Sequence, residues 1–173
     1  MIGLKKGTVK LSKNNPAWEK SFEVEKKKLF KIFGSDAVTI QHVGSTVLTT
    51  IFAKPIIDIG VIIASFDKAK QRAVALKEIG YIFKEENRTD RLFFTKGPEN
   101  KRTHYLHVGE AGSGYIENMV IFRDYLKKHK DIAKEYEILK KKLADLYSED
   151  RYTYTSKKEK FILSVIKKAK NNF

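Results

Sequence analysis

The sequence predicts an α+β fold in which a mixed β-sheet is flanked by helices and the C-terminal third is helical. The segment from Pro55 to Ile63 is nearly all isoleucine and valine, which is typical of a central strand covered on both faces. From Ser113 onward the apolar residues recur with helical spacing. A length of 173 residues fits one domain, with a sheet layer over about residues 1–112 and helices over about 113–173.

The first helix is expected to begin after Asn14 or Asn15, with Pro16 in its first turn, and to end at Gly34. Its apolar residues are spaced by four and seven positions, so one face should be core. A strand is predicted at 38–43. Gly44-Ser45-Thr46 should then form a turn that leads into a short helical piece ending near residue 53.

Beyond the apolar strand, alternating patterns and turn residues predict a mixed sheet, and helical periodicity predicts the C-terminal elements. The last helix is expected to open with a capping box formed by Ser156 and Glu159. The expected strands lie near 81–83, 91–95 and 103–108, and the expected helices at 67–80, 115–129, 131–148 and 156–170.

The chain contains no cysteine, which excludes disulfides, thiolate catalysis and cysteine-based zinc sites. This composition permits a reducing compartment, and we expect a cytoplasmic protein. The longest apolar run, 56–64, is interrupted by Asp58, and no stretch resembles a signal peptide, so we expect no membrane association. The oligomeric state does not follow from the sequence.

The formal net charge of +14 makes polyanions candidate partners, RNA among them. The alternative is that the lysines simply form solvated faces of helices, because they fall in helical patterns. The lysine-rich segments concerned are 26–28, 140–142, 157–158 and 167–168.

The most informative stretch for function runs from His42 to Ile59. A Gly44-Ser45 turn that leaves a strand and enters a helix exposes backbone N–H groups that suit a phosphate. By itself such a turn is often only a turn. Asp58 strengthens the interpretation, because a carboxylate within an apolar strand is costly to bury. It could hold a divalent cation that bridges phosphates.

The same stretch resembles the GrpB family, in which a segment like HVGST is followed by a short link and KPIIDI. This family is similar to the DNA polymerase beta superfamily of nucleotidyltransferases, so the resemblance implies a nucleotidyltransferase-like fold. The resemblance covers almost the whole chain. Its other motifs are Asn15-Pro16-Ala17-Trp18, Thr103 to Val108, Phe122-Arg123-Asp124-Tyr125-Leu126, and Tyr154 with Lys158, Phe161 and Ile162.

The resemblance implies that Gly44, Ser45 and Thr46 hold phosphates and that Asp58 is a catalytic, metal-binding carboxylate, with Mg²⁺ as the expected cofactor. The superfamily strand carries two carboxylates separated by one residue, whereas Gly60 stands at the second position here. Losing one carboxylate should weaken Mg²⁺ binding severely. The expected substitute, as catalytic residue and metal ligand, is Glu110, followed by Glu85, Glu86 and Asp90.

We expect His42 and His107 to line the site as hydrogen-bonding residues rather than as metal ligands. Strand alternation places His107 and His104 on opposite faces of the sheet, which argues against a histidine cluster. Lys54, Arg123 and Lys158 complete the expected ligand-binding set. The resemblance to the family implies that these three cations neutralise the charge of the ligand.

Two functions follow as expectations. The first is a metal-dependent nucleotidyltransferase that binds a nucleotide or other phosphorylated ligand and transfers a nucleotidyl group to an unidentified acceptor. The alternative is a non-catalytic module that binds a nucleotide, a coenzyme A precursor or an RNA end, and the absent second carboxylate favours it. A third, charge-only mode of nucleic-acid binding has no ordered basic-aromatic motif behind it.

Overall fold

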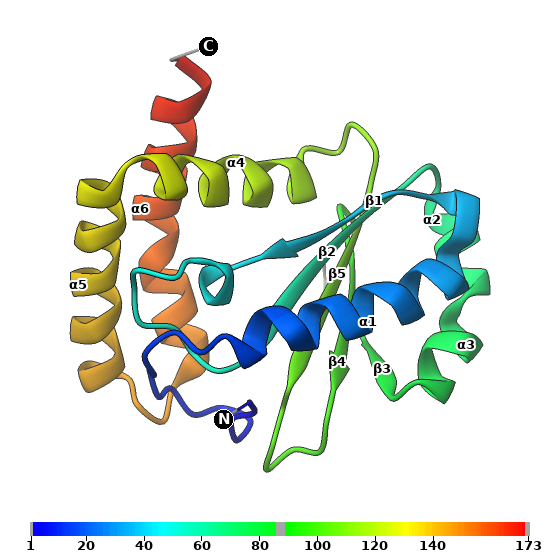
Figure 1. Cartoon of the computed structure of the whole chain (residues 1–173), viewed down its shortest axis with the longest axis horizontal. Helices are drawn as coiled ribbons and strands as arrows, with labels where there is room; N and C mark the ends of the chain where they lie inside the picture. The colour runs from blue at the N-terminus through cyan, green and yellow to red at the C-terminus, as the bar shows by residue number, and fades with distance from the viewer. Residues whose placement is uncertain (1, 86–88, 172–173) are drawn as a thin grey trace.

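The computed structural model describes residues 2–85 and 89–171, and in this part of the chain a five-stranded mixed sheet is flanked by helices (Figure 1). The strand order is β1-β2-β5-β4-β3, and only the β2–β5 pair is parallel among the described pairs. The expected α+β fold class is thus confirmed. The strands are β1 (Ala37–Val43), β2 (Ile57–Ile63), β3 (Tyr81–Lys84), β4 (Leu92–Lys96) and β5 (His104–Glu110).

The long helix α1 lies across one face of the sheet, while α5 and α6 lie side by side at one end of the molecule (Figure 1). The helix α4 contacts both α6 and the sheet. The helices are α1 (Ala17–Phe33), α2 (Phe66–Gln71), α3 (Ala73–Glu78), α4 (Tyr115–Lys128), α5 (Lys130–Leu146) and α6 (Arg151–Asn171). Two short 3-10 turns, η1 (Gly34–Asp36) and η2 (Ser45–Val47), flank β1.

The main core lies between α1 and the odd-numbered residues of β2. Ile57, Ile59, Val61 and Ile63 are fully buried there, because alternate strand residues point to the same face. The apolar face of α1 packs against them. As the sequence predicts, the helix begins after Asn15, whose side-chain oxygen accepts a hydrogen bond from the Ala17 N–H at 2.9 Å.

A second core joins the C-terminal helices to the link between η2 and β2. In this core Leu48 and Ile51 of the link are buried against Leu126, Tyr136 and Val165 of α4, α5 and α6. Leu48 and Ile51 therefore anchor the link to the C-terminal helices.

Three predicted elements differ from the structure. The helix expected between Gly44 and residue 53 is only the single turn η2. The helix expected at 67–80 is divided into α2 and α3 at Arg72. The last helix begins at Arg151, so Ser156 lies inside it, and the Asp150 carboxylate caps its first turn by accepting the Thr153 N–H at 3.0 Å. Aspartate is one of the residues preferred at the N-cap of a helix.

Within residues 2–85 and 89–171, no helix combines the length and the apolar character needed to cross a lipid bilayer.

Candidate anion site beside Asp58

The turn after β1 lies directly against Asp58 of β2. Val43 pairs with Asp58 across the two strands, which brings Gly44 beside the carboxylate. Gly44 has a φ of 72°, and a Cβ placed on it would lie 2.5 Å from the Asp58 Oδ2 atom. Only glycine fits both the backbone angle and the close approach. The turn and the acidic strand therefore meet, as the spacing of these residues suggests.

Asp58 is ionised at neutral pH and is held by His107. Its side chain is 26% exposed, and its Oδ1 atom lies 3.3 Å from His107 Nε2. Burial acts to raise the pKa of Asp58, but the His107 hydrogen bond and the charges of Lys54 and Lys158 lower it below its usual value. The register places His107 on the same face of the sheet as Asp58 and His104 on the other face, as the alternation predicts.

Two lysines converge on the same site, where the charge of Asp58 acts on both of them. The Nζ atoms of Lys54 and Lys158 lie 5.2 and 4.4 Å from the centre of the buried Tyr154 ring. Neither ammonium forms an ion pair or hydrogen bond with another residue in the part of the chain that the structure describes. Cation–π contacts with one ring offset only part of the cost of removing these charges from water.

The pKa values of both lysines lie below the ordinary value for lysine. Burial lowers the pKa of Lys158 to about 8, with Asp58 opposing the shift. Burial also lowers the pKa of Lys54 well below its usual value, and the nearby charges of Lys158 and Arg151 add to the effect. An anion placed between these ammonium groups would raise both pKa values again.

Two further side chains join the site from α5. The hydroxyl of Ser45 hydrogen-bonds with the phenol of Tyr136, whose pKa is raised by burial. Lys140 is buried, donates a hydrogen bond to the Phe52 carbonyl, and lies 4.9 Å from the centre of the Tyr136 ring. Burial, together with the charge of Lys158, lowers the pKa of Lys140 to about 7. The site is thus bounded by the sheet, by the 44–54 segment and by α5 and α6.

The structure does not bring His42 to the face of the sheet that carries Asp58. His42 pairs with Ile59 across the strands, so its side chain lies on the α1 face, opposite to that of Asp58. There it stacks on Phe22 with ring centres 4.7 Å apart. Its Nδ1 and Nε2 atoms lie 2.9 Å from oxygens of Glu19 and Thr46. His42 and Thr46 therefore support the turn from beneath.

The Arg123 guanidinium, for which a ligand-binding role is expected, forms hydrogen bonds with β1 and with its neighbour in α4. Its Nη1 atom donates at 2.9 Å to both the Gln41 side chain and the His42 carbonyl. Its Nε and Nη2 atoms donate to the Asp124 carboxylate at 2.7 and 3.0 Å. This arginine fastens α4 to β1.

We expect Arg123→Ala to lower the free energy of unfolding by about 2 kcal/mol, because it removes charge-assisted hydrogen bonds that join two elements. Ligand affinity should remain within about twofold of wild type, because these bonds do not face the ligand. Urea denaturation and titration calorimetry measure the two quantities. Lys128→Ala, an exposed change on the same helix, is the control; a large loss of affinity with unchanged stability would contradict this assignment.

Glu110 cannot share a cation with Asp58. In the parallel β2–β5 register Asp58 is opposite Tyr105, whereas Glu110 is opposite Ile63. Five register positions correspond to roughly 17 Å along the strand, and alternation places the two side chains on opposite faces. Glu85 follows β3, which β5 and β4 separate from β2. Glu86 lies outside the described residues.

The place of the missing second carboxylate is filled by α4. A Cβ at Gly60 would lie 2.8 Å from Ile116 Cγ2, and one at Gly109 would lie 2.7 Å from Ile116 Cγ1. The two glycines form a socket for the fully buried Ile116 side chain. No described group of three or more acidic, histidine or cysteine side chains could surround a metal. The residues present therefore do not fit the paired-carboxylate Mg²⁺ site that the fold implies.

Sequence reasoning did not place Lys140 at the site, and left segment 140–142 open between a polyanion contact and a solvated helix face. A usable signal was present, because Ala133, Tyr136, Lys140 and Leu143 recur at helical spacing and are all buried. It also left Arg151 unassigned, although the guanidinium of this residue donates to the Tyr105 hydroxyl and to the Thr8 carbonyl. Arg151 is thus a third cation near Lys54.

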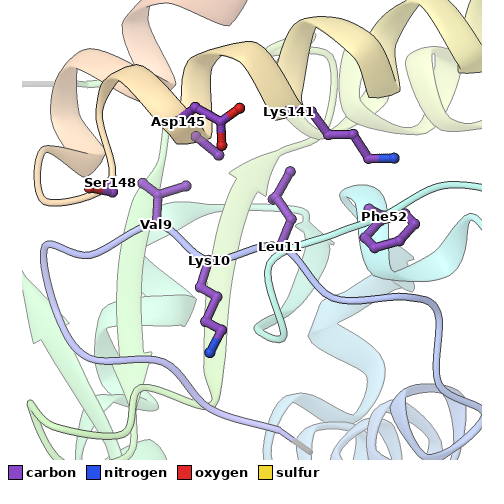
Figure 2. A pocket seen from close by; sticks show the side chains of 8 residues that line it. Val9, Lys10, Leu11, Phe52, Lys141, Asp145 and Ser148 are labelled. Atoms are coloured by element: carbon purple, nitrogen blue, oxygen red, sulfur yellow. The ribbon is translucent and has the colours of Figure 1, made fainter.

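Two grooves of the surface are lined by residues other than Lys54, Asp58 and Lys158. A groove of about 540 Å³ runs between the N-terminal segment and α5, and Figure 2 shows Phe52 and Lys141 at one end of it and Ser148 at the other. Lys10 points out of this groove in the same view. A second groove, of about 580 Å³, lies between α1 and β1.

The sequence model of a family described as GrpB protein matches residues 8–168. UPF0157 protein YqkA of Bacillus subtilis is 40% identical over 157 residues, which cover 90% of this chain but only 46% of that protein. Glutamate-rich protein GrpB of Alkalihalophilus pseudofirmus is 38% identical over 171 residues, covering 96% of this chain and 98% of that protein. The chain thus spans less than half the length of one relative and nearly all of the other.

Solved structures show the same relationship. The crystal structure of conserved protein GrpB from Enterococcus faecalis has a TM-score of 0.85 and 33% identity, covering 92% of this chain and 96% of that chain. The Cid1 poly(U) polymerase with bound MgGTP has a TM-score of 0.50 and 14% identity, covering 75% of this chain and 42% of that chain. At this identity the second likeness shows a nucleotidyltransferase-like fold alone.

Proposed function

The chain belongs to the GrpB family, and from this premise we propose that it binds a nucleotide or another phosphorylated ligand at the Asp58 site without transferring a nucleotidyl group. We define the Asp58 site as Ser45, Lys54, Asp58, Lys140 and Lys158. The observation that carries the proposal is that the half-buried Lys54 and Lys158 form no ion pair and have only Asp58 as a nearby carboxylate, so the described site holds more positive than negative charge.

Each cation has a role in this proposal. Lys54 and Lys158 donate charge-assisted hydrogen bonds to phosphate oxygens, and Lys140 adds positive charge from behind the link. Ser45 exchanges its bond with Tyr136 for one with the ligand. Asp58, held by His107, accepts a hydrogen bond from a hydroxyl or amino group of the ligand. The likeness to the fold of Cid1, which was solved with MgGTP, supports a nucleotide as the ligand class. It does not support the polymerase reaction of Cid1 for this chain.

Binding rather than transfer is supported by the packing over Gly60. Nucleotidyl transfer by paired metals needs a second carboxylate next to Asp58, and the Ile116 side chain fills that space. Mg²⁺ is therefore not required for binding in this proposal. A coenzyme A precursor and the phosphorylated end of an RNA share the chemistry of the proposed ligand, and the same titrations distinguish them from ATP.

The test is a calorimetric titration with ATP in buffer containing EDTA, repeated with Mg²⁺. We expect saturable binding in both, Lys158→Met to weaken it, and the exposed Lys168→Met on the same helix to leave it unchanged. Asp58→Asn should retain binding, because it removes a negative charge from the neighbourhood of the phosphates. Binding that needs Mg²⁺ and is lost in Asp58→Asn, or release of pyrophosphate with an acceptor, would sink the proposal in favour of catalysis.

The affinity for ATP should depend on pH through the lysines of the Asp58 site. Phosphate oxygens favour the protonated form of a lysine, so the complex takes up protons wherever the free site has lost them. With pKa values of about 7 for Lys140 and about 8 for Lys158, affinity should be highest below about pH 7. It should fall by up to about tenfold per pH unit for each lysine between about pH 7 and 9.

The stability of the ligand-free protein should change in the opposite direction. Between about pH 8 and the ordinary lysine pKa of 10.5, the unfolded chain holds a proton on Lys158 that the folded chain has released. Stability therefore rises with pH across this window and is lost as pH falls through about 8. Calorimetry and thermal melts at matched ionic strength measure both trends, and Lys158→Met should flatten both. An affinity that is constant from pH 6.5 to 9 is the contrary result.

A further inference from the structure

A groove of about 580 Å³ follows the outer side of β1 and is bounded by α1. It is separate from the Asp58 site, because its floor is the 37–41 segment of β1 and its wall is the C-terminal half of α1. The residues that line it are Glu23, Lys26, Lys27, Phe30 and Lys31 of α1 with Ala37, Val38, Thr39, Ile40 and Gln41.

The floor of the groove is a free strand edge. Among the described strands, β1 is the terminal strand of the sheet and pairs only with β2. The His42 carbonyl accepts a hydrogen bond from Arg123 of α4, so it points away from β2. In an antiparallel strand the N–H and C=O groups of one residue share a side, and alternate residues repeat it. The N–H and C=O groups of Ile40 therefore face the groove, and Arg123 marks its end.

One exposed apolar side chain from α1 and one from β1 lie along this groove. Phe30 of α1 is 63% exposed and Val38 of β1 is 64% exposed. Val38 has no partner in β2, because the register shifts between Ala37 and Thr39. Such a bulge turns a side chain out of the regular alternation. Two apolar side chains thus flank unpaired backbone groups.

The charge along the groove is positive. Lys26 lies 3.8 Å from Glu23, whereas Lys27 and Lys31 form no ion pair with a residue among those described. A second copy of β1 would bring these lysines against their own counterparts, since a two-fold interface joins like surfaces. An acidic strand would instead meet opposite charge.

We propose that this groove binds an extended acidic segment of a partner protein, which adds to β1 as a further strand through Ile40 and packs its apolar residues on Phe30 and Val38. Strand addition takes its affinity from main-chain hydrogen bonds and its specificity from alternate side chains. The lysines on α1 select the acidic residues of the segment.

The test uses fluorescence anisotropy with the 173-residue chain and a short labelled peptide of alternating valine and glutamate. Binding should be saturable and should protect the Ile40 amide from hydrogen exchange. The double variant Lys27→Glu/Lys31→Glu should weaken binding by about tenfold or more, because it reverses the charge of the groove. Lys167→Glu/Lys168→Glu, an equal charge change at exposed positions of α6, should bind nearly as well as wild type.

A second peptide separates strand addition from charge attraction. Proline in place of the central valine keeps the charge but removes a main-chain donor and the extended pairing, and it should bind at least about tenfold more weakly. Equal affinity of the two peptides, equal losses in both double variants, or no binding at all would overturn the proposal. Sedimentation that shows a dimer broken by Phe30→Glu would also overturn it, because the occupant would then be a second copy.

Discussion

Replacing Lys54 and Lys158 together by methionine is expected to abolish ATP binding while raising the melting temperature of the ligand-free protein. Each ammonium is expected to donate a charge-assisted hydrogen bond worth about 1.5–3 kcal/mol, so losing both should weaken binding at least about hundredfold. Methionine has a similar length but carries no charge. Because both lysines lie in a site with depressed pKa values, the free protein should gain stability by losing them.

The opposite signs of these two effects make the experiment specific. Replacing a lysine that supports the fold lowers the melting temperature. Replacing a lysine that serves to bind an anion raises the melting temperature of the ligand-free protein. For a chain of this length, each kcal/mol should move the melting temperature by roughly 2–4 °C. Thermal melts and calorimetry on the same samples measure both quantities, with Lys167→Met/Lys168→Met as the matched control. A melting temperature that falls together with the affinity would show that the lysines support the fold instead.

Gly60→Asp is expected to destabilise the protein by about 3 kcal/mol or more, and not to restore a metal site. Its Cβ would lie 2.8 Å from Ile116 Cγ2, which forces α4 away from the sheet. The new carboxylate would be buried near the ionised Asp58, which adds a cost for like charges. Urea denaturation measures the loss of stability, and titration with Mn²⁺ measures any metal binding.

The double variant Gly60→Asp/Ile116→Ala is the companion to this experiment. Shortening Ile116 creates room for the aspartate, so the cost of overpacking should fall, although the cavity in α4 has a cost of its own. If Gly60→Asp alone is as stable as wild type and binds Mn²⁺ tightly, the socket formed by Gly60 and Gly109 does not restrict the site. Nucleotidyl transfer would then regain its support.

The sequence predicts well those features that depend on neighbours along the chain. The limits of α1 follow from Asn15 and Gly34, and the buried character of β2 follows from its run of isoleucine and valine. The capping box at Ser156 is misleading, because Asp150 caps the helix instead, and the helix begins at Arg151, five residues before its predicted start. Both residues are suitable helix caps by their local sequence, and the packing of α6 determines which of them caps the helix.

The functional residues also divide into those that depend on neighbours along the chain and those that depend on tertiary packing. Gly44 and Asp58 could be paired from the sequence, because only the short link and one strand register separate them. Glu110 and Arg123 could not be placed, since their positions depend on the β2–β5 register and on where α4 docks. The face on which His42 lies could not be derived from the sequence, because it is set by the pairing between β1 and β2.

The sequence by itself determined the α+β class, the family, and the meeting of a glycine turn with one acidic strand, because these depend on periodicity, composition and adjacent residues. Only the tertiary structure decided that Lys54 and Lys158, about a hundred residues apart, share one buried ring, and that Ile116 fills the space beside Gly60. The physical reason is that burial and charge act through distance in space, and docking of α4 and α6 on the sheet sets those distances.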